Sequence, residues 1–405
     1  MKKLGVLLAV FLLTLAPSNA IEEQNTDDNT YRFDSAESVI QSNQLYEAPV
    51  ILDKPDEHLN LETENTALKP ADDTYRLKIE SNKIPSSLLE KYTTWNIEKG
   101  PIEKLHFWSG YKTNADFDFY QDGHNTTRFY QGLINVFLDG EFRGGQEEFR
   151  IMLDPTPQSE RPYLQPFVQD LYIQTKRIPH HKILIGNSRA GVGIEGAQSS
   201  YTLPFLNRAQ ISRNYGTARK FGLRVRGDYK LVNYDIGGYS SDTYFSSFFP
   251  GAEFDGWVNF KPLGKTDGKY GTLIAGGGIV SGKRHDVDFF VTGANLSYEY
   301  KKFWARAEYE AANGSNGYTG LTKNKSHGWY AAAGYYITPK LEIVARYDEF
   351  DPNRHIRHNN QREYSAGLNY YIKGQALRLT INYVYCQYDN KTDAHRLLLG
   401  TQIAL

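Results

Sequence analysis

Residues 220–240 read KFGLRVRGDYKLVNYDIGGYS, and apolar and polar side chains alternate along their first half. One parity carries Leu223 and Val225, and the other carries Arg224 and Arg226. Alternation of this kind predicts a β-strand with one face in apolar surroundings and the other in polar surroundings. This stretch leaves open whether its apolar face meets a protein core or lipid.

The N-terminus of the chain indicates its compartment. Residues 1–20, MKKLGVLLAVFLLTLAPSNA, combine two lysines, an apolar run and a small-residue end, which is the pattern of a cleaved export signal. The remaining sequence contains no apolar run of about eighteen residues, the length that a transmembrane helix needs. We therefore expect an exported chain without a transmembrane helix.

Charge is distributed unevenly along the chain. Residues 21–100 hold 17 acidic and 8 basic residues, whereas residues 101–405 hold 30 acidic and 36 basic residues. Low apolar content and excess charge predict that residues 21–100 form a largely disordered segment, which we place in the periplasm. The basic remainder is rich in aromatic residues and glycine, with Tyr 30, Phe 21 and Gly 35. That composition suits many alternating strands joined by turns.

From residue 101 onward the sequence breaks into alternating segments, each followed by a turn signal. The number of predicted strands is sixteen, which is even. Their ranges are 104–119, 127–142, 147–154, 167–177, 181–189, 218–229, 231–240, 253–262, 269–281, 288–300, 302–312, 327–337, 340–350, 361–372, 376–388 and 394–405.

The connections between these strands fall into two classes. Those after even-numbered strands are mostly tight, such as RGGQ at 143–146, and those after odd-numbered strands are mostly longer, such as SSDTYFSSFFPGAE at 240–253. Short turns on one rim, long loops on the other and an even strand number are typical of outer-membrane barrels. We predict an all-β protein in which residues 101–405 form a transmembrane 16-stranded antiparallel β-barrel. Both termini would then be periplasmic.

Parity in the later strands predicts which side chains face the lumen. In the strand 376–388, for example, Leu379 and Ile381 share one face and Arg378 and Thr380 share the other. In a barrel of this type the apolar face meets lipid and the polar face lines the lumen. The lumen-facing candidates from this argument are Arg306, Arg346, Arg378 and Asp228.

Three stretches resemble the phosphate-selective porin O and P family of bacterial outer-membrane channels. They are VARYDEFDPN at 344–353, YSAGLNYYIKGQALRLTINYVYCQY at 364–388, and QDLYIQTKRIPHHKILIGNSRAGVGIEGAQSSYTLPFLNRAQ at 169–210, which is followed by the opening stretch. The resemblance implies a sixteen-stranded barrel, usually a homotrimer, with a long loop folded inward to constrict each pore. It also implies that arginines at the constriction contact the solute.

The longest connection, 190–217, is the expected constriction loop, because loops of this length are more often functional than not. Arginine suits a pore for anions, because its charge persists and its planar fork holds an oxyanion. The alternative is that these arginines pair with acids such as Asp170 and Asp228 and brace the wall. The pore candidates are Arg189, Arg208, Arg213, Arg219, Arg224 and Arg226.

Other motifs have plainer interpretations. GVGIEG at 191–196 matches the dinucleotide pattern GxGxxG, but no helical periodicity follows it, so we interpret it as a flexible loop. His180 with His181, and His355 with His358, lack a nearby third ligand, so we predict no metal site. We expect no cofactor, no catalytic site and no nucleic-acid partner.

The sequence therefore predicts an outer-membrane porin for passive diffusion of small solutes, with a preference for anions such as phosphate or other oxyanions. Its expected partners are outer-membrane lipid, small anionic solutes and two further copies of the chain. Two alternatives remain open: a general, weakly selective channel for sugars or amino acids, and a structural or adhesion protein of the outer membrane.

Overall fold

The computed structural model describes residues 83, 85–155, 167–216, 218–241, 251–284, 287–314 and 324–405. All of them belong to one unit, Gln44–Leu405. The predicted signal peptide and nearly all of the acidic segment lie outside the described residues. So do the central parts of three predicted loops, at 156–166, 242–250 and 315–323.

The sixteen predicted strands are all present, and their ends differ from the predicted ends by three residues or fewer. The alternation along each strand is what made these ranges predictable. The strands are β2 (Ile102–Tyr120), β3 (Asn125–Phe142), β4 (Glu147–Leu153), β5 (Val168–Thr175), β6 (His181–Arg189), β7 (Arg219–Asp228), β8 (Val232–Ser240), β9 (Ala252–Phe260), β10 (Thr272–Arg284), β11 (Val287–Tyr300), β12 (Phe303–Asn313), β13 (Lys325–Thr338), β14 (Leu341–Asp351), β15 (Gln361–Tyr371), β16 (Leu377–Tyr388) and β17 (Ala394–Ala404).

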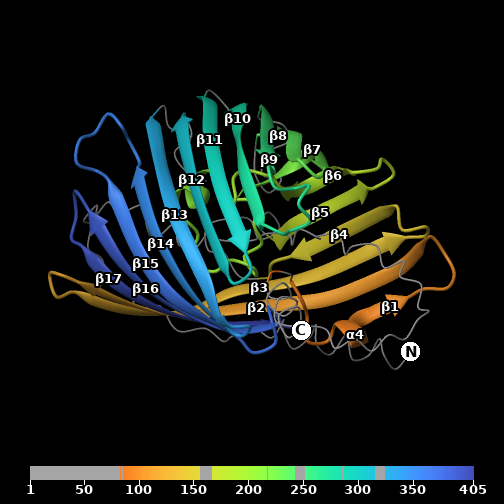
Figure 1. Ribbon diagram of the computed structural model, residues 1–405, viewed down its shortest axis with the longest axis horizontal. Helices are drawn as coiled ribbons and strands as arrows, with labels where there is room; N and C mark the ends of the chain where they lie inside the picture. Colours follow the sequence, from red (N-terminus) through yellow and green to blue (C-terminus); the bar gives the residue numbers. More distant parts are fainter. Residues whose placement is uncertain are drawn as a thin grey trace, which may run out of the picture. The chain divides into compact units, whose positions relative to one another are not determined.

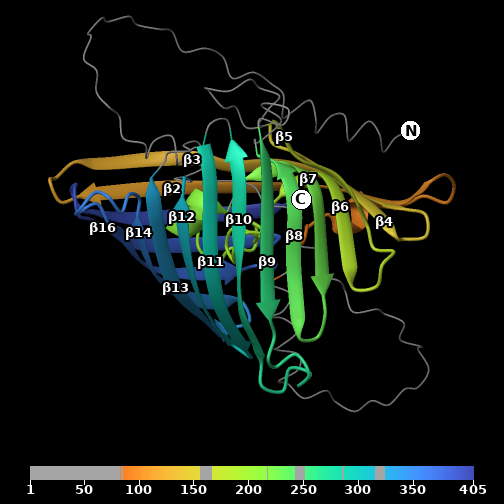
Figure 2. The ribbon, with the colours of Figure 1, turned by 90° about the horizontal axis from the view of Figure 1, so that it is seen from above.

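These strands form a closed barrel (Figures 1 and 2). Each strand from β2 to β16 pairs antiparallel with the next, and β17 pairs with β2 over Ala394↔Tyr120 to Ala404↔Gly110. Closure leaves no strand edge among the sixteen, so their backbone groups are satisfied within the wall. The predicted 16-stranded antiparallel β-barrel is confirmed.

The connections form two rims of different character. Residues 301–302 and 339–340 are examples of the tight turns on one rim, and the connections at 190–218 and 352–360 lie on the other. We call these the short-turn rim and the long-loop rim. Outer-membrane barrels place their short turns at the periplasm.

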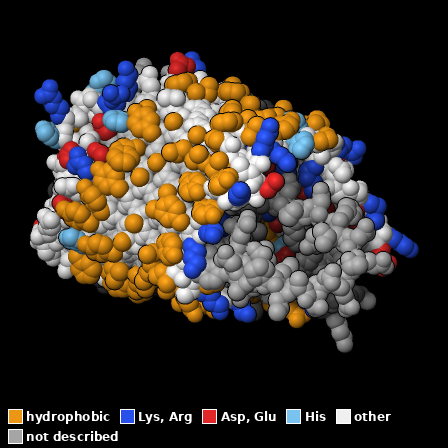
Figure 3. All heavy atoms as spheres, in the orientation of Figure 1, with side chains coloured by type: hydrophobic (Ala, Val, Ile, Leu, Met, Phe, Trp, Pro, Cys, Tyr) orange, Lys and Arg blue, Asp and Glu red, His pale blue; other side chains and the backbone are white. Residues whose placement is uncertain are grey.

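The outer face of the wall is apolar. Leu223, Ile343 and Ile381 all expose more than two fifths of their surface, whereas Arg346 and Arg378 on the opposite parity are buried. On the face shown in Figure 3, hydrophobic side chains cover a broad band and charged side chains gather toward its borders. The alternation of the opening stretch therefore turns its apolar face outward, toward lipid.

A row of aromatic rings follows this outer face near the long-loop rim. The rings of Trp329, Tyr347, Tyr364, Tyr385 and His395 come from five consecutive strands, and each neighbouring pair has centroids 4.9–5.9 Å apart. Aromatic side chains gather at the level where the hydrocarbon meets the headgroups, because their rings combine an apolar body with a polar edge. The row marks one border of the membrane band.

Residues 85–100 are ordered, which differs from the expectation for the end of the acidic segment. They contain a helix, α4 (Glu90–Thr93), and a strand, β1 (Thr94–Asn96), which pairs with Lys104–His106 of β2. Such short elements leave no periodicity in the sequence, and here the partner strand supplies their order. Within the part of the chain that the structure describes, no helix is long and apolar enough to cross a membrane.

Candidate functional site

The connection between β6 and β7, residues 190–218, is the candidate site, and we call it the β6–β7 segment. It contains one short helix, α6 (Gln210–Tyr215). The sequence predicts no element here. Four of its six residues are polar and six residues make fewer than two turns, so the sequence shows no apolar stripe of helical period.

Backbone carbonyls of the irregular part of the segment bond to inward-facing side chains of the wall. Lys112 Nζ donates to Ser200 O at 2.8 Å, and Gln402 Nε2 donates to Tyr201 O at 3.0 Å. Buried backbone groups need such partners wherever no helix or strand supplies them. Three further wall side chains do the same: Arg378 to Leu203 O (2.8 Å), Asn369 to Pro204 O (2.8 Å) and Arg346 to Asn207 O (3.0 Å).

The carboxylate of Glu195 joins the segment to β12 and β14 of the wall. Arg306 Nη2 lies 2.5 Å from one of its oxygens, and Arg346 Nη1 lies 3.3 Å from the other. The Ala209 N–H donates to the same carboxylate at 2.6 Å, just before α6 begins. Glu195 is fully buried, so these charge-assisted bonds act where water does not screen them.

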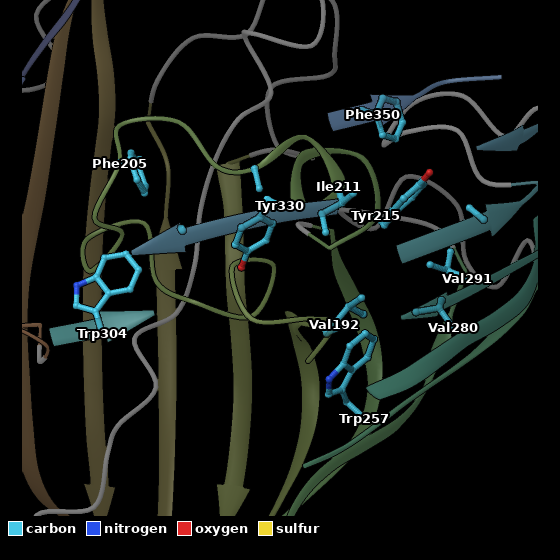
Figure 4. Close-up of a cluster of buried hydrophobic side chains, with 14 of the residues drawn as sticks. Val192, Phe205, Ile211, Tyr215, Trp257, Val280, Val291, Trp304, Tyr330 and Phe350 are labelled. Carbon is cyan, nitrogen blue, oxygen red and sulfur yellow. The ribbon is translucent and has the colours of Figure 1, made fainter. Parts of the chain in front are cut away.

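Apolar side chains of the segment fill the space between these polar contacts. Figure 4 shows Val192, Phe205 and Ile211 among side chains of the wall such as Trp257 and Tyr330. Tyr215 adds a hydrogen bond to Ser326 of β13, with 2.6 Å between the two oxygens. The segment therefore has its own packed core inside the ring of strands.

Most of the predicted pore arginines bond to groups of the protein itself. Arg219 pairs with Asp170 at 2.7 Å, and both side chains are fully buried. Arg213 pairs with Glu363 of β15 at 2.7 Å. Arg224 donates from Nε to Asp235 at 2.6 Å and from Nη1 to Arg189 O at 2.6 Å, and Arg189 donates to Gly196 O at 3.3 Å.

Three inward-facing cations donate to neutral acceptors instead. Arg226 donates to the side-chain oxygen of Gln174 at 2.8 Å, and Arg378 donates to Leu203 O and Gln402. Lys112 donates to Ser200 O. Dipoles of neutral groups thus solvate these side chains, and Arg226 also has Asp235 as its cross-strand neighbour.

Arg208 lies in the segment itself and donates to the Glu195 and Gln198 carbonyl oxygens. Burial lowers the pKa of its guanidinium well below the ordinary value, and the nearby charges of Arg219 and Arg306 lower it further. A negative solute brought close to this group would offset that repulsion.

Asp228 needs a correction, because it does not lie with the arginines. Its side chain is 76 % exposed at the end of β7, and it pairs with Lys261 at 2.5 Å. The acid that holds Arg224 is Asp235 on the next strand. Parity predicts the face that a side chain takes, but the final residue of a strand sits at the rim, where either direction leads to water.

The remaining motifs serve the fold. A side chain at Gly191 would overlap Asp235, and one at Gly193, where φ is +66°, would overlap Glu308. These glycines of the GVGIEG stretch let the segment approach the wall closely. Among the described residues there is no group of three or more His, Cys, Asp or Glu side chains that could hold a metal ion.

A cavity of about 450 Å³ lies between the segment and the wall toward the short-turn rim. Gln198, Thr202 and Arg306 line one part of it. Its aromatic lining comes from Trp304, Tyr336 and Tyr371. Glu342 fixes two of these rings, because it accepts hydrogen bonds from Trp304 Nε1 and Tyr371 OH, each at 2.7 Å.

Several residues that matter here were not singled out from the sequence. Glu195, Lys112, Asn369 and Gln402 hold the segment, and Glu342 orders the aromatic lining. The strand residues among these share a feature that could have identified them. Each is a polar side chain at a position that alternation turns toward the lumen, and its two neighbours in the sequence are uncharged. Glu195 has no such signal, because it lies in an irregular glycine-rich stretch.

Solved outer-membrane proteins share this fold. The outer membrane channel DcaP of Acinetobacter baumannii aligns with a TM-score of 0.52 at 13 % identity, over 77 % of this chain and 99 % of that chain. OmpT of Vibrio cholerae aligns with a TM-score of 0.54 at 11 % identity, over 77 % and 100 %. The anion-selective porin from Comamonas acidovorans aligns with a TM-score of 0.52 at 10 % identity, over 74 % and 99 %.

Comparison of the sequence with curated proteins gave no match. The family described as phosphate-selective porin O and P matches residues 241–405, which run from the start of the β8–β9 connection to the C-terminus. The resemblance expected from the sequence is thus confirmed over that range, and the fold of the chain is that of solved outer-membrane porins.

Proposed function

We propose that the protein is a passive porin that favours small anions, with the β6–β7 segment as its constriction. The observation that carries the proposal is the contact pattern of this segment, which bonds to inward-facing side chains of β2, β3 and β12 to β17. A solute that crosses the barrel has to pass what this segment leaves open. The charges beside it then decide which solutes enter.

Cations with neutral partners support the preference for anions. Arg226 and Arg378 donate hydrogen bonds to neutral acceptors, and Arg208 lies close to other cations. The wall also carries buried acids, such as Glu308, so the preference should be moderate. The anion-selective porin from Comamonas acidovorans shows that this fold can carry such a preference.

The test is the reversal potential of the purified protein in a planar bilayer across a KCl gradient. If the channel favours anions, its reversal potential has the sign of the chloride equilibrium potential. Arg226→Gln should lower the preference while leaving the barrel intact, because the lost hydrogen bond goes to a neutral amide. Absence of current would refute the channel, and a cation preference would refute the anion selectivity.

A second candidate follows from the aromatic lining of the cavity. Trp304, Tyr336 and Tyr371 present rings, and Gln198 and Thr202 present hydrogen-bonding groups, to the same 450 Å³ space. Rings together with polar groups also suit neutral ring-shaped solutes such as sugars. Liposome swelling with neutral sugars of increasing size tests this candidate, since swelling is independent of charge.

We also propose that the protein assembles as a homotrimer, as implied by the family resemblance. One solved structure of Vibrio cholerae OmpT is described as a trimer form, which supports the proposal for this fold. Native mass spectrometry in detergent should give three times the mass of the mature chain. A species with the mass of one chain would overturn it.

A further inference from the structure

The chain crosses the short-turn mouth of the barrel before it enters β2. β1 pairs with β2, and the Leu88 N–H donates to Ala404 O, at the end of β17, at 2.9 Å. Further toward the N-terminus, Lys83 Nζ lies 2.5 Å from a carboxylate oxygen of Glu299, near the end of β11. Lys83 and residues 85–96 together form what we call the N-terminal strap.

The anchors of the strap lie far apart around the short-turn mouth. Six strand spacings separate β17 from β11, which corresponds to about 28 Å along the wall. Five residues extend over at most about 18 Å. The backbone from Leu88 to Lys83 is therefore too short to span this distance along the wall by itself, and the side chains of Lys83 and Glu299 complete the connection.

The cavity under the β6–β7 segment gives independent evidence for this placement. Lys83 and Pro85 of the strap line the same cavity as Gln198 and Thr202 of the segment. Glu299 lines it as well, and its partner across the strands is Trp304, another lining residue. The strap and Glu299 thus share the inside of the barrel at the short-turn mouth.

The charges at this mouth are balanced by the strap. The side chain of Glu299 is 47 % exposed to the mouth and that of Lys83 is 27 % exposed. Without Lys83, Glu299 would present a negative charge to every solute that passes. Fields in a narrow lumen act on ions more strongly than at an open surface, because the low-dielectric wall confines them.

We propose that Lys83 is a specificity-determining residue, which cancels the charge of Glu299 and keeps the short-turn mouth permissive for anions. The inference rests on the proposed porin function and adds a residue outside the β-barrel to it. It also gives the strap a role in permeation, beyond its contacts with β2 and β17.

The test compares reversal potentials of the full-length protein and three variants: Lys83→Gln, Glu299→Gln and the double variant. Lys83→Gln should lower the anion-to-cation permeability ratio about twofold, because one unit charge about 8 Å away acts with opposite sign on anions and cations and is screened by salt of about 0.1 M. Glu299→Gln should raise the ratio, and the double variant should return close to the wild type. The differences should shrink in 1 M salt, where screening extends only about 3 Å.

Lys91→Gln is the matched control, since Lys91 is an exposed lysine in α4 of the same strap. It should leave the ratio unchanged. Gel migration before and after heating checks that every variant forms the barrel. A ratio for Lys83→Gln equal to that of the wild type overturns the inference. A wild-type channel that prefers cations overturns the proposed anion preference instead, while the difference between variants still tests Lys83.

Discussion

Glu195 is the residue on which we expect the position of the β6–β7 segment to depend most. Its carboxylate accepts bonds from Arg306, Arg346 and the Ala209 N–H, and it is fully buried. Glu195→Gln removes the carboxylate paired with Arg306 and the nearest of the three carboxylates around Arg346, and loss of one partner of a buried pair costs roughly 3–5 kcal/mol. The segment should loosen, so single-channel current should become larger and noisier.

Glu98→Gln is the control for this prediction, because Glu98 is exposed in the connection between β1 and β2 and its loss removes the same charge. It should leave the single-channel trace unchanged. The barrel of the Glu195 variant should still shift on heating, because the strand pairs do not involve Glu195. A quiet trace of wild-type amplitude would show that the segment does not need this carboxylate.

Replacement of Arg219 should change the stability of the barrel, whereas replacement of Arg226 should change its ion selectivity. Arg219 and Asp170 form a pair with both side chains fully buried. Arg219→Met leaves the Asp170 carboxylate buried without its cation, which should lower the free energy of unfolding by roughly 3–5 kcal/mol. Urea unfolding in detergent micelles, followed by tryptophan fluorescence, measures this loss.

The double variant Arg219→Met with Asp170→Leu separates charge burial from packing. Apolar replacement of a whole buried pair is often neutral or stabilising, so the double variant should recover most of the lost stability. If it stays as unstable as the single variant, the guanidinium contributes through its shape and contacts, such as the one with Met152 Sδ at 3.4 Å.

At the scale of the strand, the outward parity makes a direct prediction about lipid. Ile343 lies in β14, on the outer face, with 41 % of its surface exposed. Ile343→Arg places a charge on the lipid side, which costs roughly 2–4 kcal/mol at the membrane midplane. The variant should unfold at lower urea concentration from lipid bilayers.

His355→Arg is the matched substitution in water, since His355 is exposed in the connection 352–360. It introduces the same side chain and should leave the free energy of unfolding within about 0.5 kcal/mol of the wild-type value. Equal effects of the two arginines would mean that the face carrying Ile343 does not meet hydrocarbon.

The strands were the predictable part of this protein, and the reason is physical. A wall between lipid and water forces alternation on every strand, as in Leu379 against Arg378, and the pattern survives in the sequence. β1 and α4 were missed because three or four residues carry no period. α6 was missed because its six residues are mostly polar and make fewer than two turns, which is too few for an apolar stripe.

The site was less predictable than the wall. Parity placed Arg306, Arg346 and Arg378 on the inner face, but it could not give their partners. Arg346 and Arg378 donate to carbonyls of the β6–β7 segment, and Arg306 pairs with Glu195. These partners are more than a hundred residues away in the sequence, and the segment that carries them has no repeating pattern to fix its register.

For the whole molecule, the charge balance of the interior follows from its construction. A segment without strands inside the barrel needs donors for its carbonyls, and long cationic side chains such as Lys112, Arg346 and Arg378 reach them from the wall. Each such contact brings a cationic side chain beside the segment, and at Arg346 the carboxylate of Glu195 balances the charge. The proposed preference for anions therefore depends on the cations whose partners are neutral, such as Arg378.

Orientation in the membrane is the property of the whole molecule that the two rims predict. Short turns belong at the periplasm and long loops outside the cell. Cys386 is the chain's one cysteine and it is buried, so its replacement by alanine gives a background for single-cysteine labelling. In that background, His355→Cys on the long-loop rim should react with a membrane-impermeant maleimide on intact cells. Lys340→Cys on the short-turn rim should react only after the outer membrane is permeabilised. The opposite result would mean that the short turns face the outside of the cell.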